Sequence, residues 1–244
     1  MKKTLIAFAI LFAQNTFAQS IIIEKAKIEF ERQVNVWAGL PPGEFGDRMK
    51  QNSPQYSSSF FTFESDGKKS LYSPAQQKEE IRRGFFMSSP ASDNIVYSDF
   101  ENKRSVSIKN VFEKTYLMED SLRNAKWKIT NEFREIAGFN CRRATTIIMD
   151  SVFVVAFYAD EIMIPGGPES FNGLPGMIMG LVINRLHTTW YATKVSVTGI
   201  NATAIVPPKG KAEKTTRNKL ADLLRKTFTN WGGNSDQNIW SVEI

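Results

Sequence analysis

The sequence predicts a mainly β protein: a curved antiparallel meander sheet, or half-open barrel, with a C-terminal helix. Apolar residues alternate with polar ones along much of the chain, and this period of two places one face of a strand in a core. Short turn signals separate these stretches, which is typical of consecutive hairpins. One stretch near the C-terminus instead has its leucines at helical spacing.

The first expected strand covers residues 22–36, where apolar side chains occupy alternate positions. A Gly/Pro-rich connection follows at residues 39–46. The pair Asp66-Gly67 then predicts a tight turn between strands at 60–64 and 70–72, because glycine adopts the positive φ that such turns need.

Residues 75–83 are polar and charged, and they predict an excursion or a short helix. Hairpins resume after this segment, with turns at residues 101–103, Ala137-Gly138 and Met149-Asp150-Ser151. The strands that these turns connect are expected at 95–100, 104–112, 126–136, 139–148 and 152–159, with a late strand at 188–197.

The expected helix lies near the C-terminus. One helical face is formed by Leu220, Leu223, Leu224 and Phe228. Thr215 or Thr216 is suited to cap the start of this helix, and Gly232-Gly233 lies just past its end. In an antiparallel meander, this helix would cover one face or edge of the sheet.

Residues 1–18 are predicted to be a secretory signal peptide. Two lysines precede an apolar run at residues 5–13 that is too short to span a membrane, and Ala18 is the small residue before the cleavage site. Residues 19–244 are expected to form a single β-rich domain that is periplasmic or secreted and has no transmembrane segment after signal cleavage.

Composition limits the possible partners and cross-links. The net charge of +6 falls to +4 without Lys2 and Lys3, which is mild for a chain of this length and gives no support to a nucleic-acid partner. The single cysteine, Cys141, excludes an intrachain disulfide. The basic run at residues 209–219 favours a solvated helix entrance over contact with anionic lipid.

Cys141 and His187 are the residues that enzyme chemistry would use. Arg142 and Arg143 beside Cys141 would lower the pKa of its thiol, so a thiol hydrolase that pairs Cys141 with His187 is one alternative. Neither residue has a recognisable orienting partner, and no Gly-rich turn presents the cysteine. We therefore expect no enzyme activity and no catalytic residue, with Cys141 a half-buried structural thiol and His187 a surface-loop residue.

Three methionines suggest a second alternative, periplasmic copper handling through Met and Cys ligands. Met163 lies upstream of Met177 and Met179, and thioethers bind copper(I). The latter two are interleaved with Ile178 and Leu181 as in any buried apolar run, so core packing is favoured. A single histidine excludes metal sites built on two or more histidines, and no metal or cofactor is expected.

Aromatic residues are abundant, and on a curved sheet they would either line an apolar concavity or fill the core. They are Phe60, Phe61, Phe63, Phe85, Phe86, Phe153, Phe157, Tyr158, Trp190 and Tyr191.

A Gly/Pro-rich segment at residues 165–178 runs directly into the apolar block at residues 177–183 and is the candidate binding loop. Its candidate residues are Pro165, Gly167, Pro168, Phe171, Asn172, Gly173, Leu174, Pro175, Gly176 and Met177. Apolar side chains among the turn residues predict that part of the loop is held against the body of the protein. A type II turn centred on Pro175-Gly176 would place Gly176 at positive φ and direct Leu174 and Met177 toward an apolar surface.

The segment Gly173-Leu174-Pro175-Gly176-Met177-Ile178 resembles the hexapeptide that names the GLPGLI family of exported Bacteroidota proteins. The stretches at 136–144 and 164–168 resemble further landmarks of that family in the family's order. Met177 replaces the family's leucine, which conserves side-chain volume. Glu169 stands where a bulky apolar or aromatic residue is often found.

The resemblance implies a role but no reaction, because the family has no established activity. Its members are often encoded near TonB-dependent outer-membrane receptors, which implies an accessory role in the cell envelope. The leading expectation is therefore an exported binding or accessory protein, associated with an outer-membrane transport system and holding an apolar ligand or a protein partner. Copper handling and thiol hydrolysis remain the two alternatives.

Overall fold

The computed structural model describes residues 22–75, 93–111, 114–229 and 235–244. Several sequence predictions lie outside these residues: the signal peptide at 1–18, the excursion from residue 76 onward, Phe85, Phe86 and Gly232-Gly233. Within the described ranges, no helix has both the length and the apolar character needed to cross a membrane.

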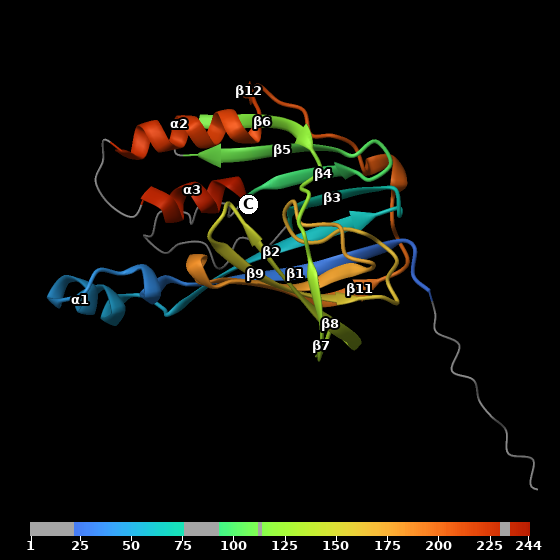
Figure 1. Cartoon of the computed structure of the whole chain (residues 1–244), viewed down its shortest axis with the longest axis horizontal. Helices are drawn as coiled ribbons and strands as arrows, with labels where there is room; N and C mark the ends of the chain where they lie inside the picture. The colour runs from blue at the N-terminus through green and yellow to red at the C-terminus, as the bar shows by residue number, and fades with distance from the viewer. Residues whose placement is uncertain (1–21, 76–92, 112–113, 230–234) are drawn as a thin grey trace, which may run out of the picture.

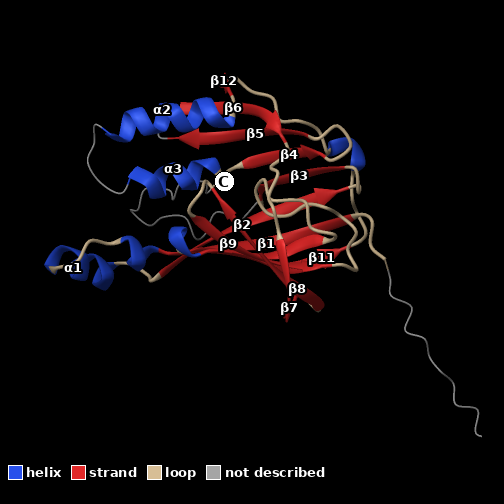
Figure 2. Cartoon of the chain, in the orientation of Figure 1, coloured by secondary structure: helices blue, strands red, loops and turns tan. Residues whose placement is uncertain are grey.

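Within the described residues, twelve strands form one large, open, curved sheet (Figures 1 and 2). The strands are β1 (Ala26–Asn35), β2 (Tyr56–Ser65), β3 (Lys69–Pro74), β4 (Ile95–Asp99), β5 (Arg104–Val111), β6 (Lys114–Ser121), β7 (Lys128–Ile136), β8 (Phe139–Ile148), β9 (Val152–Ala159), β10 (Met177–Ile183), β11 (Thr188–Ser196) and β12 (Glu213–Thr215). Among the residues that the structure describes, 49% lie in strands and 18% in helices, which confirms the predicted mainly β class with a C-terminal helix.

The sheet consists of two antiparallel meanders joined by its first strand. Its order is β12-β6-β5-β4-β3-β2-β1-β11-β10-β9-β8-β7. Strands β1 to β6 follow one another through the first meander, and β7 to β11 through the second. The strands β1 and β11 pair with each other, so the N-terminal strand lies in the middle of the sheet. Among the strands of the described ranges, the short β12 alone runs parallel to its neighbour, β6.

The predicted turns are confirmed by backbone geometry. Gly67 has a φ of 93° in the turn between β2 and β3. Ala137 and Gly138 have φ values of 51° and 83°, and Met149 and Asp150 have 48° and 59°. Two consecutive positive φ values are the mark of a type I′ turn, which matches the twist of the strands that it joins.

The helices differ from the single one predicted. The expected helix is α2 (Arg217–Thr229), and Thr216 Oγ1 accepts a hydrogen bond from the Lys219 amide at its start. Two further helices are α1 (Glu44–Asn52) and α3 (Ser235–Glu243). The former begins within residues 39–46, which were predicted to be a Gly/Pro-rich connection, and its largest apolar side chain, Phe45, is 66% exposed. Strands β6 and β12 were also not predicted.

The core lies on one face of the sheet, which we call the inner face: the face covered by the loop at residues 160–176 and by α3. In Figure 1 this loop crosses in front of the sheet. The rings of Phe30, Phe61, Phe63, Tyr72 and Trp190 are almost completely buried there. Rings of Phe61 and Tyr72 stack with their centroids 4.7 Å apart. The aromatic residues of the inner face therefore fill the core.

The far end of the sheet curls over the opposite face, which we call the outer face. The guanidinium of Arg134 on β7 lies over the rings of Phe157 and Tyr191, at 5.9 and 5.1 Å from their centroids. It also donates a hydrogen bond to the Tyr191 hydroxyl at 3.1 Å. Strongly twisted sheets of more than about ten strands tend to curl in this way. The curl covers the outer side of β8, where Cys141 lies opposite Arg134.

Candidate functional site

The predicted binding loop is largely buried against the inner face. Of its ten candidate residues only Gly173 and Pro175 are exposed, and Pro165 is half-buried. Phe171 and Leu174 belong to the main hydrophobic core cluster. The Trp127 indole N–H donates a hydrogen bond to the carbonyl oxygen of Asn172 at 2.9 Å and so holds the loop in place. The loop therefore serves first as a structural cover of the core.

Three glycines let the loop approach its neighbours closely. A Cβ on Gly166 would lie 2.9 Å from the rings of Phe63 and Phe100, and one on Gly167 would lie 2.7 Å from Cβ of Ile178. A Cβ on Gly176 would lie 2.1 Å from a backbone carbonyl oxygen, that of Ala159. Such distances leave no room for any side chain, so packing alone requires glycine at these positions.

The prediction of a positive φ at Gly176 is wrong. The loop glycine with positive φ is Gly173, at 91°. Gly176 is needed for a different reason, its contact with the carbonyl of Ala159, which the local turn pattern does not reveal. The predicted direction of the side chains is confirmed, because Leu174 and Met177 are 3% and 0% exposed.

Beneath the loop lies a group of buried ionisable side chains, which we call the buried charged cluster. Its members are Arg32, Lys109, Arg123, Glu169 and Glu243, and each is 9% exposed or less. Buried charges are costly unless they are paired and hydrogen-bonded. This cluster is therefore the first place in the molecule to look for either a functional site or a specific structural device.

Glu169 is the member that the loop contributes. Its backbone has a φ of 55°, which is unusual for a non-glycine residue and turns the carboxylate inward. Its Oε2 accepts a hydrogen bond from Asn94 Nδ2 at 2.8 Å. Burial raises the pKa of this carboxyl, and the nearby charge of Lys109 and the bond from Asn94 oppose that rise.

Lys109 and Arg123 bind the end of α3. The Lys109 ammonium donates to the carbonyl of Val242 at 2.7 Å, and Arg123 donates to the carbonyl of Glu243. Cations at a helix C-terminus satisfy its free carbonyls and interact favourably with its dipole. Burial lowers the pKa of Lys109 to about 8. It also lowers the pKa of Arg123, although a guanidinium stays protonated at neutral pH.

Ser170 connects the loop to the same end of the helix. Its hydroxyl accepts a hydrogen bond from Arg123 Nε at 3.0 Å and donates one to the carbonyl of Ile244 at 2.6 Å. The Arg123 guanidinium also lies 5.2 Å from the centroid of the Phe171 ring. The buried charged cluster and Ser170 thus hold the loop and α3 against the inner face of the sheet. These contacts indicate a structural role for the cluster.

Sequence reasoning missed this cluster, although a signal was present. Arg32 is in phase with Ile28 and Phe30 on β1, and Lys109 is in phase with Ser107 and Val111 on β5. A lysine or arginine side chain that points from a strand into the core is unusual unless it is paired there. The acceptor of the Lys109 ammonium, the carbonyl of Val242, lies 133 positions away in the chain, so the local pattern could not identify it.

Cys141 and His187 are not brought together. Cys141 aligns through the ladder with Ala159 and Met177 at one end of β10, whereas His187 lies beyond Ile183 at the other end. Six residues of strand separate the two ends, or about 20 Å. Burial raises the pKa of the Cys141 thiol to about 12, the reverse of the activation that its arginine neighbours suggested. The thiol-hydrolase alternative therefore has no geometric support.

The methionines do not form a metal site either. Met177 and Met179 are fully buried in the hydrophobic core cluster, whereas Met163 is 55% exposed and lies outside it. Among the residues that the structure describes, no group of three or more His, Cys, Asp and Glu side chains is arranged to hold a metal ion. The arrangement favours core packing for this pair.

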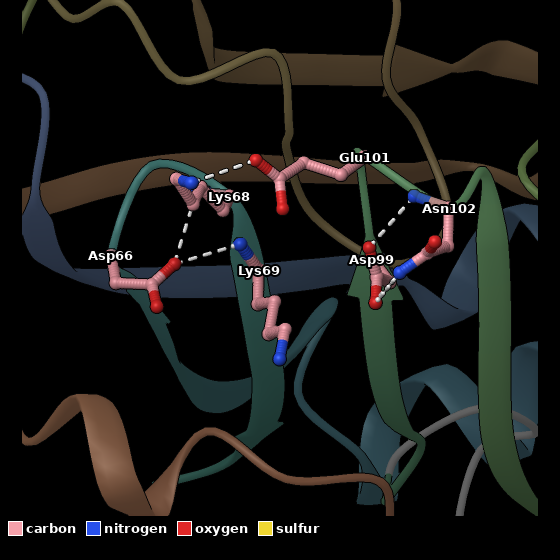
Figure 3. Close-up of polar contacts among 6 residues, drawn as sticks. All are labelled: Asp66, Lys68, Lys69, Asp99, Glu101 and Asn102. Carbon is pink, nitrogen blue, oxygen red and sulfur yellow. Dashed lines mark hydrogen bonds and ion pairs between the residues drawn. The ribbon is translucent and has the colours of Figure 1, made fainter.

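Two hairpin turns form a polar cluster at one end of the sheet (Figure 3). Asp66 Oδ1 accepts hydrogen bonds from the amides of Lys68 and Lys69 at 3.0 and 2.8 Å. Asp99 accepts two from Asn102, and the bond from the Asn102 side chain is the largest effect that lowers its pKa. Both carboxylates thus accept hydrogen bonds within their own turns and stabilise them, as Asp side chains often do.

On the outer face, a shallow depression of about 530 Å³ opens beside the turn between β10 and β11. Its lining residues are Gln33, Asn35, Tyr56, Val182, Asn184, His187, Thr188, Thr189 and Tyr191. A smaller one of about 360 Å³ adjoins it at Asn184, Arg185, His187 and Trp240. Sequence reasoning named His187 and Tyr191 singly but did not assemble this region, because its residues come from three separate parts of the chain, at 33–35, 56 and 182–191.

The turn between β10 and β11 is held firmly. His187 has a φ of 50° in the left-handed region, and its amide donates to the carbonyl of Asn184 at 3.0 Å. The carbonyl of His187 accepts from the amide of Asn35 at 2.9 Å. A non-glycine residue in this conformation persists only where its surroundings impose it, and such residues are frequent at binding sites.

Comparison with known proteins shows the fold alone. No known family profile matches the chain, and no curated protein matches its sequence. The chain is similar to the solved structure of PNGF-II in the C2 space group, with a TM-score of 0.52 and 15% identity over 83% of this chain and 33% of that one. The P21 form gives a TM-score of 0.50 and 15% identity over 84% and 34%. The chain thus spans about a third of the length of PNGF-II.

Proposed function

We propose that the chain is an exported accessory protein of the cell envelope, of the GLPGLI type, which acts by binding a protein partner and catalyses no reaction. The partner class that we propose is a component of an outer-membrane TonB-dependent transport system. The signal-like N-terminal pattern and the hexapeptide at residues 173–178 support the compartment and the family.

The inner face gives little support to an apolar ligand. Fully buried aromatic rings occupy it, and the loop and α3 cover them. A ligand would have to displace a cover that is fastened by the buried charged cluster. A protein partner at the surface requires no such opening.

The observation that carries the proposal is an exposed apolar pair on the outer face. Ile147 on β8 and Phe153 on β9 lie directly opposite each other in the ladder, and they are 63% and 43% exposed. Val155 and Val182 continue the same face and are partly exposed. Covering one large apolar side chain contributes about 1.5–3 kcal/mol, so this outer apolar pair is a plausible centre for a protein contact.

The test is cross-linking of the tagged protein in the bacterium that encodes it, followed by identification of the captured proteins by mass spectrometry. An outer-membrane transport component should be captured by the natural protein and lost from the Ile147→Thr, Phe153→Thr double variant. Ile129→Thr is a matched control, because Ile129 is also exposed but lies on β7 away from the pair. Equal capture by the double variant and the natural protein would refute the proposed surface.

A further inference from the structure

The depression beside the β10–β11 turn has an unusual lining. All of its polar lining residues are neutral amides, hydroxyls, phenols or an imidazole, and no Asp, Glu, Lys or Arg is among them. Its volume of about 530 Å³ lies in the range of small-molecule sites, about 300–1,000 Å³. A charged ligand would lose water here without meeting an opposite charge among the lining residues, which is unfavourable. The nearby guanidinium of Arg134 is bound to the Tyr191 hydroxyl. The lining therefore favours a neutral ligand.

Most hydrogen-bonding groups of the lining are uncommitted. Within the described residues, no intramolecular hydrogen bond is made by the side chains of Gln33, Asn35, Asn184, His187 and Thr189. An amide offers two donors and one acceptor, and a hydroxyl offers both functions. A ligand that matches these side chains would present hydrogen-bond donors and acceptors side by side at several positions. Adjacent hydroxyl groups do this.

Two tyrosines add apolar surface to this polar set. Tyr56 is 49% exposed at the start of β2, and Tyr191 is partly buried, with its hydroxyl bound to Arg134. A phenol ring offers an apolar face beside a polar tip. The tyrosine rings can pack against the C–H groups on the face of a ligand ring. The neighbouring amides and hydroxyls can bind hydroxyl groups at the edge of that ring. A saccharide has both.

The site is also rigid before any ligand arrives. The strands β1, β10 and β11 pair continuously beneath it, and the His187 turn is fixed by backbone hydrogen bonds at both its amide and its carbonyl. Groups that are already in place lower the entropic cost of binding. Depressions with mobile linings do not have this property.

We propose that this depression is a binding site for a neutral, polyhydroxylated ligand, a saccharide chain. Asn184 and Thr189 supply hydrogen bonds to its hydroxyl groups, and Tyr56 packs against a ring face. The site meets the outer apolar face at Val182 but contains neither Ile147 nor Phe153, and it goes beyond the proposed partner binding. It can therefore fail while partner capture survives, and the reverse also holds.

Nuclear magnetic resonance tests the proposal directly, because Gln33, Asn35 and Asn184 carry side-chain amides that report from the site. The probes are maltotetraose, chitotetraose and mannotetraose, each at about 10 mM, which saturates a site of millimolar affinity. At least one probe should shift these amide signals, and charged tetragalacturonate should not. If all three neutral probes leave the three amides unshifted, or if tetragalacturonate shifts them equally, the proposal is wrong.

Paired variants then separate a specific site from general contact. Thr189→Val keeps the shape and removes one hydroxyl, so it should raise the dissociation constant about three- to tenfold, whereas Thr198→Val, exposed outside the depression, should not change it. Tyr56→Ala should weaken binding about tenfold, and Tyr56→Phe, which keeps the ring, should restore it. Unchanged affinity in both Thr189→Val and Tyr56→Ala would overturn the assignment of the site.

Discussion

On the inner face of the central strands, Arg32 on β1 lies opposite Trp190 on β11, and both are buried. One residue earlier on β1, Glu31 lies opposite Tyr191 on the outer face, where both remain partly exposed. The same ladder therefore carries two environments. On the inner face, Lys109, Arg123 and Glu169 bind groups from distant parts of the chain. In the outer depression, five lining side chains make no hydrogen bond within the described residues.

This contrast changes where a function is expected. The hexapeptide loop is the most distinctive part of the sequence, and it lies on the inner face. Its glycines allow close packing against the core, and Glu169 holds the loop in place through its bond to Asn94. The outer face has no distinctive sequence, yet it presents exposed apolar side chains and unpaired hydrogen-bonding groups. A conspicuous motif and a binding surface are here two different regions.

The largest effect is expected where the loop approaches the sheet most closely, at the contact of Gly176 with the carbonyl of Ala159. Gly176→Ala places a Cβ about where the Ala159 carbonyl oxygen lies, so we expect destabilisation of about 4 kcal/mol or a failure to fold. Gly39→Ala is the control, since a Cβ there meets no atom within 4 Å and its φ is not positive. Urea unfolding measures both, and near-natural stability of Gly176→Ala would contradict the structural role of the loop.

Lys109→Met tests whether the buried charged cluster fastens α3. The change leaves the carbonyl of Val242 without its donor and removes the charge that lowers the pKa of Glu169 most, so we expect a loss of about 3 kcal/mol. Lys114→Met, on the exposed start of β6, should cost less than about 0.5 kcal/mol. Hydrogen exchange should rise in α3 for the first variant only.

A double variant sharpens this test. Adding Glu169→Gln to Lys109→Met removes both charges of the pair, so the combined loss should be smaller than the sum of the single losses by about 1 kcal/mol. Strict additivity would mean that the two residues act independently.

The pH dependence of stability follows from Lys109. Its pKa is about 8 in the folded protein and lower than in the unfolded chain, so the unfolded state binds more protons between these values. The contribution of Lys109 to stability should therefore be present above pH 10 and be lost as the pH falls toward 8. We expect a difference of about 1–3 kcal/mol between pH 10 and pH 8, absent in Lys109→Met. The same slope in both proteins would rule out Lys109 as its source.

The smallest effect is expected on the outer face. Ile147→Thr and Phe153→Thr keep residues that suit strands and remove little buried surface, so the free energy of unfolding should change by less than about 0.5 kcal/mol each. A larger loss would show that the outer apolar pair stabilises the fold and would remove the ground for a partner site there.

The sequence by itself determined the β class, the hairpins and α2, because each depends on local pattern. Period-two alternation on β1, the turns at Gly67 and Ala137-Gly138, and the leucine face of α2 are set by neighbours in the chain. The burial of Leu174 and Met177 followed in the same way, from apolar residues placed among turn residues.

Only the tertiary structure decided the rest, because the causes are contacts between distant segments. Gly176 is required by the carbonyl of Ala159, which no turn rule contains. Lys109 is stabilised by the end of α3, 133 positions later, and the outer depression exists because β1, β2, β10 and β11 meet. Local pattern fixes which way a side chain points, whereas its partner, its burial and its pKa depend on which strands become neighbours.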